Sequence, residues 1–357
     1  MKRYFTLVAL TFAAVTVAFA QPERVGQAGA VELLINSMPR SSGFNGLDLG
    51  NSSGIESSMI NPAGIARTTG TELLFARTAW LRGSDIFINS FGFSQGFGAD
   101  GGSIGLLINT VNLGEFVRTT TSQPDGTLGT FSPTFLNIGL SYAKKFTDRI
   151  HVGATARIIN QSTPEVSASG IALDAGVQYR SGEKDRLKLG IALRNVGPTM
   201  AFGGDGLSGR VAFESTNPYE TAVELPTARF ELPTTLSMGG SYDFFLGNDN
   251  TVTVLGSFIS NSFYLNQGGL GLAYSYKDIV MLRGSFLYEQ GIFGDLGIDR
   301  FNAHTGGAVG ASFQIPFGDA KFDASSNETF SSFSLDMSYR FTNPFSGTFT
   351  FGARIDI

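Results

Sequence analysis

Residues that could support catalysis or hold a metal ion are few and scattered in this chain of 357 residues. It has two histidines, His151 and His304, and no cysteine. Neither histidine has a second ligand at the spacing of known metal sites, and no serine stands in the strand–turn–helix setting of a hydrolase nucleophile. We therefore predict a protein that is not an enzyme and needs neither a cofactor nor a metal ion.

The other chemically capable residues are single charges set among small and apolar residues. They fall on the polar side of a two-residue alternation and include Asp174, Arg194, Asp243, Arg283, Asp336, Arg340, Arg354 and Asp356. Inside a barrel, such charges would form a wet ion-pair network. That network could guide a polar solute or hold an internal plug against the wall. We favour the structural role, because a plugged barrel has to satisfy these charges.

The elements that would position these charges are strands. In 187–194, leucine and isoleucine alternate with Lys188, Gly190, Ala192 and Arg194. Successive side chains of a strand point to opposite faces, so this pattern gives one apolar face and one small or charged face. The chain contains about 14 such segments, an even number as in single-chain membrane barrels. The predicted strands are 71–80, 85–95, 102–112, 134–146, 149–160, 168–180, 187–195, 231–245, 251–260, 267–276, 279–289, 305–316, 331–341 and 347–357.

Composition separates a barrel in lipid from a soluble β-sandwich, which would show the same alternation. Charged residues make up only 15% of the chain, which contains 46 Gly, 32 Phe and 10 Tyr. The polar faces carry Gly, Ser and lone charges rather than the Lys and Glu of a watered surface. We predict an all-β, transmembrane, antiparallel up-and-down barrel surrounded by outer-membrane lipid. The net charge of -5 argues against nucleic acid as a partner.

The two ends of the sequence support export to a bacterial outer membrane. Lys2 and Arg3 precede an apolar run that ends in Ala18-Phe19-Ala20, which is typical of a cleavable signal peptide. We assign 1–20 to this signal, 21–70 to a plug without regular strands, and 71–357 to the barrel. The last segment resembles the C-terminal signal of outer-membrane assembly clients in a set of four residues, Thr350, Gly352, Ile355 and Ile357.

Connector lengths predict two different ends of the barrel. Short connectors such as 147–148 and 277–278 would be periplasmic turns, and the long connectors 113–133 and 196–230 would be extracellular loops. Connector 317–330 is long for the periplasmic side, where it would make a contact of its own.

Short motifs resemble a known family. The block Asn61-Pro62-Ala63-Gly64, which precedes the first strand, resembles one in the PorV/PorQ family, relatives of the FadL-type barrels. The segments 169–179 and 189–202 resemble the paired-strand motif of that family. The resemblance implies a non-enzymatic component of the type IX secretion system. Such a protein would bind the C-terminal signal domain of cargo, receive it from the translocon pore protein and deliver it to the surface attachment complex.

Aromatic residues in the two long loops would offer apolar surface to such partners; they are Phe116, Phe131, Phe202, Phe213 and Tyr219. An alternative is a FadL-like outer-membrane channel for hydrophobic small molecules. A third hypothesis is a structural barrel without a ligand. The sequence leaves these functions open.

Overall fold

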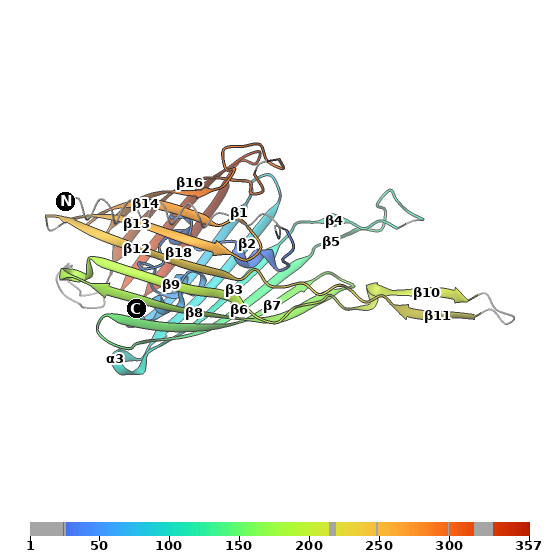
Figure 1. The fold of residues 1–357 in the computed structure, drawn as a ribbon, viewed down its shortest axis with the longest axis horizontal. Coiled ribbons are helices and arrows are strands. Elements are labelled where there is room, and N and C mark those ends of the chain that lie inside the picture. The colour runs from blue at the N-terminus through green and yellow to red at the C-terminus, as the bar shows by residue number, and fades with distance from the viewer. Residues whose placement is uncertain are drawn as a thin grey trace.

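The strands of the computed structural model close into one barrel (Figure 1). Around the ring, the order of its 14 strands is β1-β18-β17-β16-β15-β14-β13-β12-β9-β8-β7-β6-β3-β2, and the pairing is antiparallel throughout. The bounds are β1 (Thr71–Trp80), β2 (Ile86–Gly96), β3 (Ser103–Asn112), β6 (Thr134–Lys145), β7 (Ile150–Ser162), β8 (Ser167–Ser181), β9 (Leu187–Val196), β12 (Thr235–Leu246), β13 (Asn250–Asn261), β14 (Gln267–Tyr276), β15 (Val280–Glu289), β16 (His304–Pro316), β17 (Ser332–Thr342) and β18 (Thr348–Asp356). The predicted fold class, an antiparallel barrel of about 14 strands, is confirmed.

The described residues are 24, 26–120, 122–213, 219–247, 249–298, 300–317 and 331–357, without the side chains of 99, 100, 210–213, 219 and 220. The predicted signal peptide 1–20 lies outside them. So does the predicted periplasmic contact of connector 317–330, apart from Phe317.

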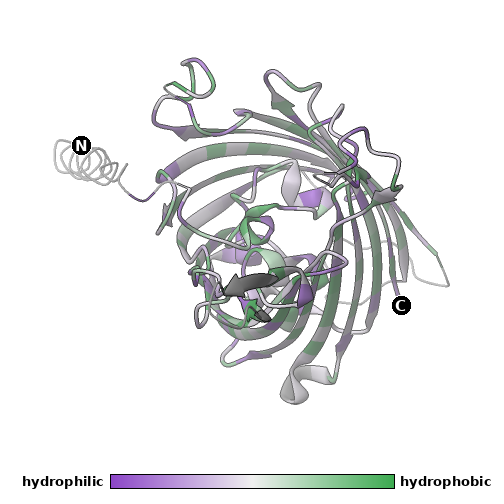
Figure 2. Cartoon of the chain, turned by 90° about the vertical axis from the view of Figure 1, so that its right-hand side faces the viewer, coloured by the Kyte–Doolittle hydropathy of each residue, from purple (hydrophilic) through white to green (hydrophobic). Residues whose placement is uncertain are grey.

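The apolar face of each strand points away from the barrel axis. In β9, Leu189 and Ile191 are 44% and 52% exposed, while Lys188 and Gly190 between them are buried. In β18, Phe349 and Phe351 are exposed and Thr350 is buried. Exposed apolar side chains around a whole barrel are unfavourable in water and favourable against hydrocarbon. The alternation in the sequence therefore corresponds to an apolar outside and a polar lumen, the barrel interior. Figure 2 shows the same alternation as hydrophobic and hydrophilic bands along the strands.

The two long connectors contain strands that the sequence did not predict. β4 (Phe116–Val117) pairs with β5 (Thr130–Phe131), and β10 (Ser208–Phe213) pairs with β11 (Tyr219–Glu224). Both hairpins project beyond the barrel (Figure 1), and we call this the loop end. The opposite end, where short connectors such as 146–149 and 277–279 join the strands, is the turn end. Strand β12 begins at Thr235 rather than at 231, because Pro233 has no backbone N–H for the ladder.

Residues 31–67, the lumen segment, lie inside the ring (Figure 2). They form short helical turns, which are η1 (Val31–Leu34), α2 (Pro39–Ser42), η2 (Ile55–Met59) and η3 (Pro62–Arg67). Helices elsewhere are equally short: α3 (Gly98–Gly101), η4 (Glu183–Asp185) and η5 (Asp205–Leu207). Among the described residues, no helix has the length and apolar character needed to cross a membrane.

The main core of the protein lies between the lumen segment and the wall. Met38, Leu49 and Ile55 of the lumen segment are at most 1% exposed and pack with Leu74 of β1 and Leu107 of β3. Full burial of a side chain of this size contributes about 1.5–3 kcal/mol. This packing fixes the lumen segment against the strands that carry the charges.

Candidate functional site in the barrel lumen

The side chain of Asn61 joins the lumen segment to the wall. Its Oδ1 accepts from the Ala63 N–H (3.2 Å) and caps η3, while Nδ2 donates to the carbonyl oxygens of Leu49 (3.1 Å) and Val177 (3.0 Å). An asparagine can make these contacts together because its amide carries both an acceptor and two donors. The Val177 contact is the one that reaches β8.

Glycines in the wall let η3 approach closely. A Cβ on Gly176 would lie 2.0 Å from Asn61 Oδ1, and one on Gly153 would lie 2.4 Å from the Pro62 carbonyl oxygen. Any larger residue there would push the lumen segment inward. The structure therefore gives Asn61-Pro62-Ala63-Gly64 a local role, which is to seat η3 on β7 and β8. Closure of the lumen by this segment stays a prediction.

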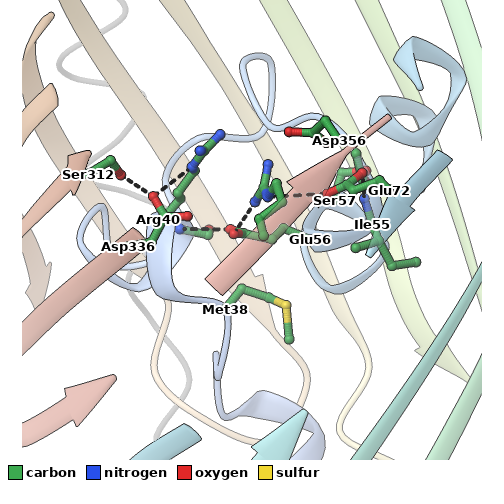
Figure 3. Close-up of polar contacts among 12 residues, drawn as sticks. Met38, Arg40, Ile55, Glu56, Ser57, Glu72, Ser312, Asp336 and Asp356 are labelled. Atoms are coloured by element: carbon green, nitrogen blue, oxygen red, sulfur yellow. Dashed lines mark hydrogen bonds and ion pairs between the residues drawn. The ribbon is translucent and has the colours of Figure 1, made fainter. Parts of the chain in front are cut away.

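One ion-pair group joins α2 to β15 and β17. Arg40 Nε donates to Asp336 Oδ1 (2.8 Å), and Arg283 lies 3.8 Å from the same oxygen. The Ser312 hydroxyl also donates to Asp336 (Figure 3). The carboxylate thus receives several donors, as a buried charge requires.

A second group centres on Arg354 of β18. It pairs with Glu56 of η2, and its Nε lies 3.3 Å from Glu72 of β1. Glu72 also accepts from the Ile55 N–H (2.8 Å) and the Ser94 hydroxyl (3.0 Å). Figure 3 shows Glu56 and Glu72 with their polar contacts. One wall arginine therefore holds the lumen segment at the seam where β1 meets β18.

Two further ion pairs lie along β7, β8, β9 and β12. Arg157 contacts Asp174 at 2.7 Å, and the other oxygen of Asp174 accepts from the Asn195 N–H (2.6 Å). Lys188 contacts Asp243 at 2.6 Å. All four residues are buried, with at most 9% of their surface exposed.

Two further predicted charges, Arg194 and Arg340, contact backbone carbonyl oxygens of the lumen segment. Arg194 donates to the Met59 carbonyl oxygen. Arg340 lies over the Trp80 ring, 5.0 Å from its centroid, and Nη2 is 3.4 Å from the Asn36 carbonyl oxygen. Planar guanidinium groups favour both kinds of contact.

The structure brings the predicted lumen charges into several groups and adds partners that were not predicted. Arg157, Lys188 and Glu72 stand on the same inward side of the alternation, so that pattern could have identified them. Arg40 and Glu56 belong to a segment without a repeating pattern, and no sequence signal marks them as partners of strands near the C-terminus. Asp356 accepts from the Ser332 hydroxyl (3.1 Å) at the turn end.

A cavity of about 330 Å³ lies between the lumen segment and the loop-end halves of the strands. Its apolar lining includes Leu33, Ile35, Ile60, Ile259, Leu265 and Leu287. Arg194, Arg340, His304 and Glu289 add polar groups. Trp80, whose ring meets His304 edge-on at 5.0 Å, also lines it. An apolar wall with a few convergent polar groups is the usual character of a site for small organic molecules.

A second cavity, of about 500 Å³, opens at the turn end and is mainly polar. Its lining includes Arg40, Arg67, Glu72, Arg354 and Asp356. The ion-pair groups of the lumen segment therefore separate an apolar cavity at one end from a polar cavity at the other.

Burial perturbs one carboxyl of the lumen segment. Burial, with a smaller contribution from the negative charge of Glu56, raises the pKa of Asp48 to about 6, while the Ser41 hydroxyl, 2.5 Å away, opposes the shift. Asp48 therefore changes charge at a mildly acidic pH.

The described loop aromatics, Phe116, Phe131 and Phe202, pack in two different places. Phe116 and Phe131 stack on the β4–β5 hairpin with centroids 5.8 Å apart, and Phe116 is 47% exposed. Phe202 instead packs on Phe230, against a cluster that includes Leu33 of the lumen segment. The side chains of Phe213 and Tyr219 lie outside the described residues.

The predicted assembly-signal residues lie on β18 or at the chain end. Thr350 and Gly352 face the lumen, and Ile355 and Ile357 are exposed. The backbone of Ile357 pairs with Thr71, the first residue of β1 (2.8 Å). Recognition by an assembly machinery stays a prediction. Within the described residues, no group of three or more histidine or acidic side chains is placed to hold a metal ion.

Comparisons with known proteins place the fold. No protein-family model matches the chain, and no curated protein matches it. Among solved structures, the toluene transporter TodX of P. putida superposes with a TM-score of 0.53 at 11% identity, over 90% of this chain and 96% of that one. The Ralstonia pickettii toluene transporter TbuX (TM-score 0.50, 13% identity, 90% and 97%) and the CymD monoaromatic hydrocarbon channel (0.50, 14%, 90% and 97%) are similar too. These likenesses show the fold alone, which this chain shares with proteins described as toluene transporters and a monoaromatic hydrocarbon channel. They do not extend to the PorV/PorQ resemblance, which stays a prediction.

Proposed function

We propose that this protein is an outer-membrane channel for hydrophobic small molecules, with the turn end in the periplasm. The observation that carries the proposal is the cavity of about 330 Å³ next to the lumen segment, lined by aliphatic side chains and facing the loop end. A molecule with an apolar body would bury itself against Leu33, Ile60 and Leu287. The shared fold with proteins described as toluene transporters supports the proposal.

The single tryptophan provides a direct assay, because Trp80 lines this cavity. The purified barrel in neutral detergent is titrated with toluene or with a medium-chain fatty acid, and Trp80 fluorescence is recorded. We expect a saturable change. Ile35→Phe narrows the cavity and should weaken binding about tenfold, since overpacking costs about 1–3 kcal/mol.

Ile171→Phe is the matched control, because Ile171 is 55% exposed on the outside of β8. It should bind as the wild type does. Absence of saturable binding by any apolar probe, or equal weakening by both substitutions, would refute the channel proposal.

The hairpins favour a second candidate function, type IX protein secretion. The β4–β5 hairpin carries Phe116 and Val117, which are 47% and 58% exposed, well beyond the barrel (Figure 1). Such a hairpin can add its strand edge or its apolar side chains to a folded partner. In this candidate the partners are the C-terminal signal domains of cargo, the translocon pore protein and the surface attachment complex.

A deletion strain separates the two candidates. Under the secretion hypothesis, proteins bearing the C-terminal signal accumulate in the periplasm of a strain that lacks this gene. A chain without 115–131 should fail to restore their surface display, whereas Ile35→Phe should restore it. Normal surface display in the deletion strain would eliminate the secretion hypothesis.

A further inference from the structure

A row of basic side chains crosses three neighbouring strands near the turn end. His151 lies on β7, Arg180 on β8 and Lys188 on β9, and all three are buried on the lumen side. Arg180 stands directly opposite Lys188, and His151 stands opposite Gln178, two residues before Arg180. Residues in these register positions share one face of the sheet, so their side chains are neighbours.

The lumen segment adds another cation, Arg67, at the end of η3. Its Nη1 donates to the Asn51 carbonyl oxygen (3.3 Å), and the Asn51 side-chain oxygen accepts from Lys188 Nζ (2.8 Å). Arg67 and Lys188 therefore meet at one residue. Arg67 also lines the turn-end cavity, so this cation borders open space.

The buried carboxylate near these cations, Asp243, already has partners. Asp243 contacts Lys188 at 2.6 Å and accepts from the Thr253 hydroxyl at 2.7 Å. Asp185 on η4 and Asp243 both act on Arg67 electrostatically. Asp185 is exposed to solvent, which screens its charge, and Asp243 is already paired with Lys188. Within the described part of the chain, no ion pair joins Arg67 or Arg180 to a carboxylate.

Two of the wall groups are buried without partners. Arg180 is 6% exposed, and its Nε and Nη2 atoms have no hydrogen-bond partner among the described residues. His151 is also 6% exposed, and its Nδ1 atom is equally unpartnered within them. Burial, together with the positive charge of Arg180, lowers the pKa of Arg67. Buried guanidinium donors without acceptors are unfavourable, so a further acceptor beside Arg180 would stabilise the folded barrel.

We propose that Arg67, Arg180 and His151 together bind a compact oxyanion of the phosphate type. Guanidinium groups donate in a planar fork that matches phosphate oxygens, and charge-assisted hydrogen bonds of this kind are the strong ones. A bound oxyanion would satisfy the free donors of Arg180 and bridge the end of η3 to the wall. The site lies at the opposite end of the lumen from the apolar cavity, so it does not depend on the channel proposal.

Equilibrium dialysis with inorganic phosphate tests the site. The mature barrel, in neutral detergent and chloride buffer of constant ionic strength, should bind phosphate saturably. Arg180→Gln and Arg67→Gln should each weaken binding about tenfold to a hundredfold, which is the usual effect of losing a hydrogen bond to a charged group. Arg149→Gln is the matched control, because Arg149 is exposed at the same end of the barrel and outside the cluster. It should leave binding unchanged.

A urea titration keeps the test valid if a variant folds poorly. Phosphate should raise the urea midpoint of unfolding of the wild type and leave that of Arg180→Gln unchanged. Arg67→Gln is a second variant for the same measurement, because Arg67 lies on the lumen segment and its substitution leaves the strands of the wall unaltered. A short-chain phosphatidate in the dialysis assay separates a lipid headgroup from the free ion as the source. Saturable binding of either probe that is lost in Arg180→Gln supports the site. Binding of neither probe, or an equal loss in Arg149→Gln, overturns it.

Discussion

The contact of Asn61 with the wall gives a quantitative prediction for the lumen segment. Asn61→Ala removes three hydrogen bonds, to Ala63, Leu49 and Val177. Each neutral hydrogen bond contributes about 1 kcal/mol net, so the local opening free energy of residues 49–67 should fall by about 3 kcal/mol. Since about 1.4 kcal/mol is a factor of ten, opening becomes on the order of a hundredfold more frequent.

Amide hydrogen exchange measures this opening directly. The Asn61 N–H donates to the Ser57 carbonyl oxygen at 2.7 Å, and the Gly64 N–H donates to the Asn61 carbonyl oxygen at 3.0 Å, so both amides report on the lumen segment. In Asn61→Ala they should exchange on the order of a hundredfold faster, while amides of β13 and β14 keep their rates, because local opening leaves the ladder intact.

Asn160→Ala is the control. The Asn160 side chain bonds Ser169 at 2.9 Å near the loop end and does not reach the lumen segment. It should leave exchange in 49–67 unchanged. The reasoning is refuted if Asn61→Ala changes those rates less than twofold, or if it accelerates exchange equally in the barrel strands.

Other substitutions test the close packing and the charges of the lumen. Gly176→Ala places a methyl group 2.0 Å from the asparagine amide oxygen and should speed exchange in 49–67, whereas Gly203→Ala meets nothing within 4 Å and should not. Burial raises the pKa of Asp48 to about 6. The ionised form is therefore disfavoured in the folded state, so the contribution of Asp48 to stability is highest below the unfolded pKa of about 3.9, falls as pH rises to about 6 and is then flat. The shift corresponds to roughly 3 kcal/mol, and the urea midpoint of Asp48→Asn should lack this dependence between pH 4 and 7; a wild type with the same pH profile as the variant contradicts it. Arg354→Gln leaves two buried glutamates without their arginine and should lower the free energy of unfolding by about 3–5 kcal/mol at neutral pH. An unchanged urea midpoint would refute this prediction.

The sequence alone determined the barrel. A two-residue alternation is a local property, so Leu187, Leu189 and Ile191 reveal an apolar face without any knowledge of neighbouring strands. The low content of charge then decides that this face meets hydrocarbon, and turn residues limit the strand ends. A predicted strand end was wrong where a single residue overrides the alternation, as Pro233 does before β12. The β4–β5 hairpin was missed, because strands of two residues carry too few alternating positions to be recognised.

The sequence likewise predicted one part of the candidate site and not the other. The alternation identified Asp174, Arg283 and Asp336 as inward charges. It could not identify their partners, because Arg40 and Asp336 meet only after the whole ring has closed around the lumen segment.

The tertiary structure alone decided where charge is matched and where it is not. Lys188 and Arg180 occupy equivalent inward positions in adjacent strands, yet Asp243 forms its ion pair with the lysine, and Nε and Nη2 of the arginine have no hydrogen-bond partner among the described residues. The tertiary structure also decided the positions of the two cavities. The path of residues 31–67 has no sequence period, so the space that remains around it is set by contacts between residues far apart in the chain.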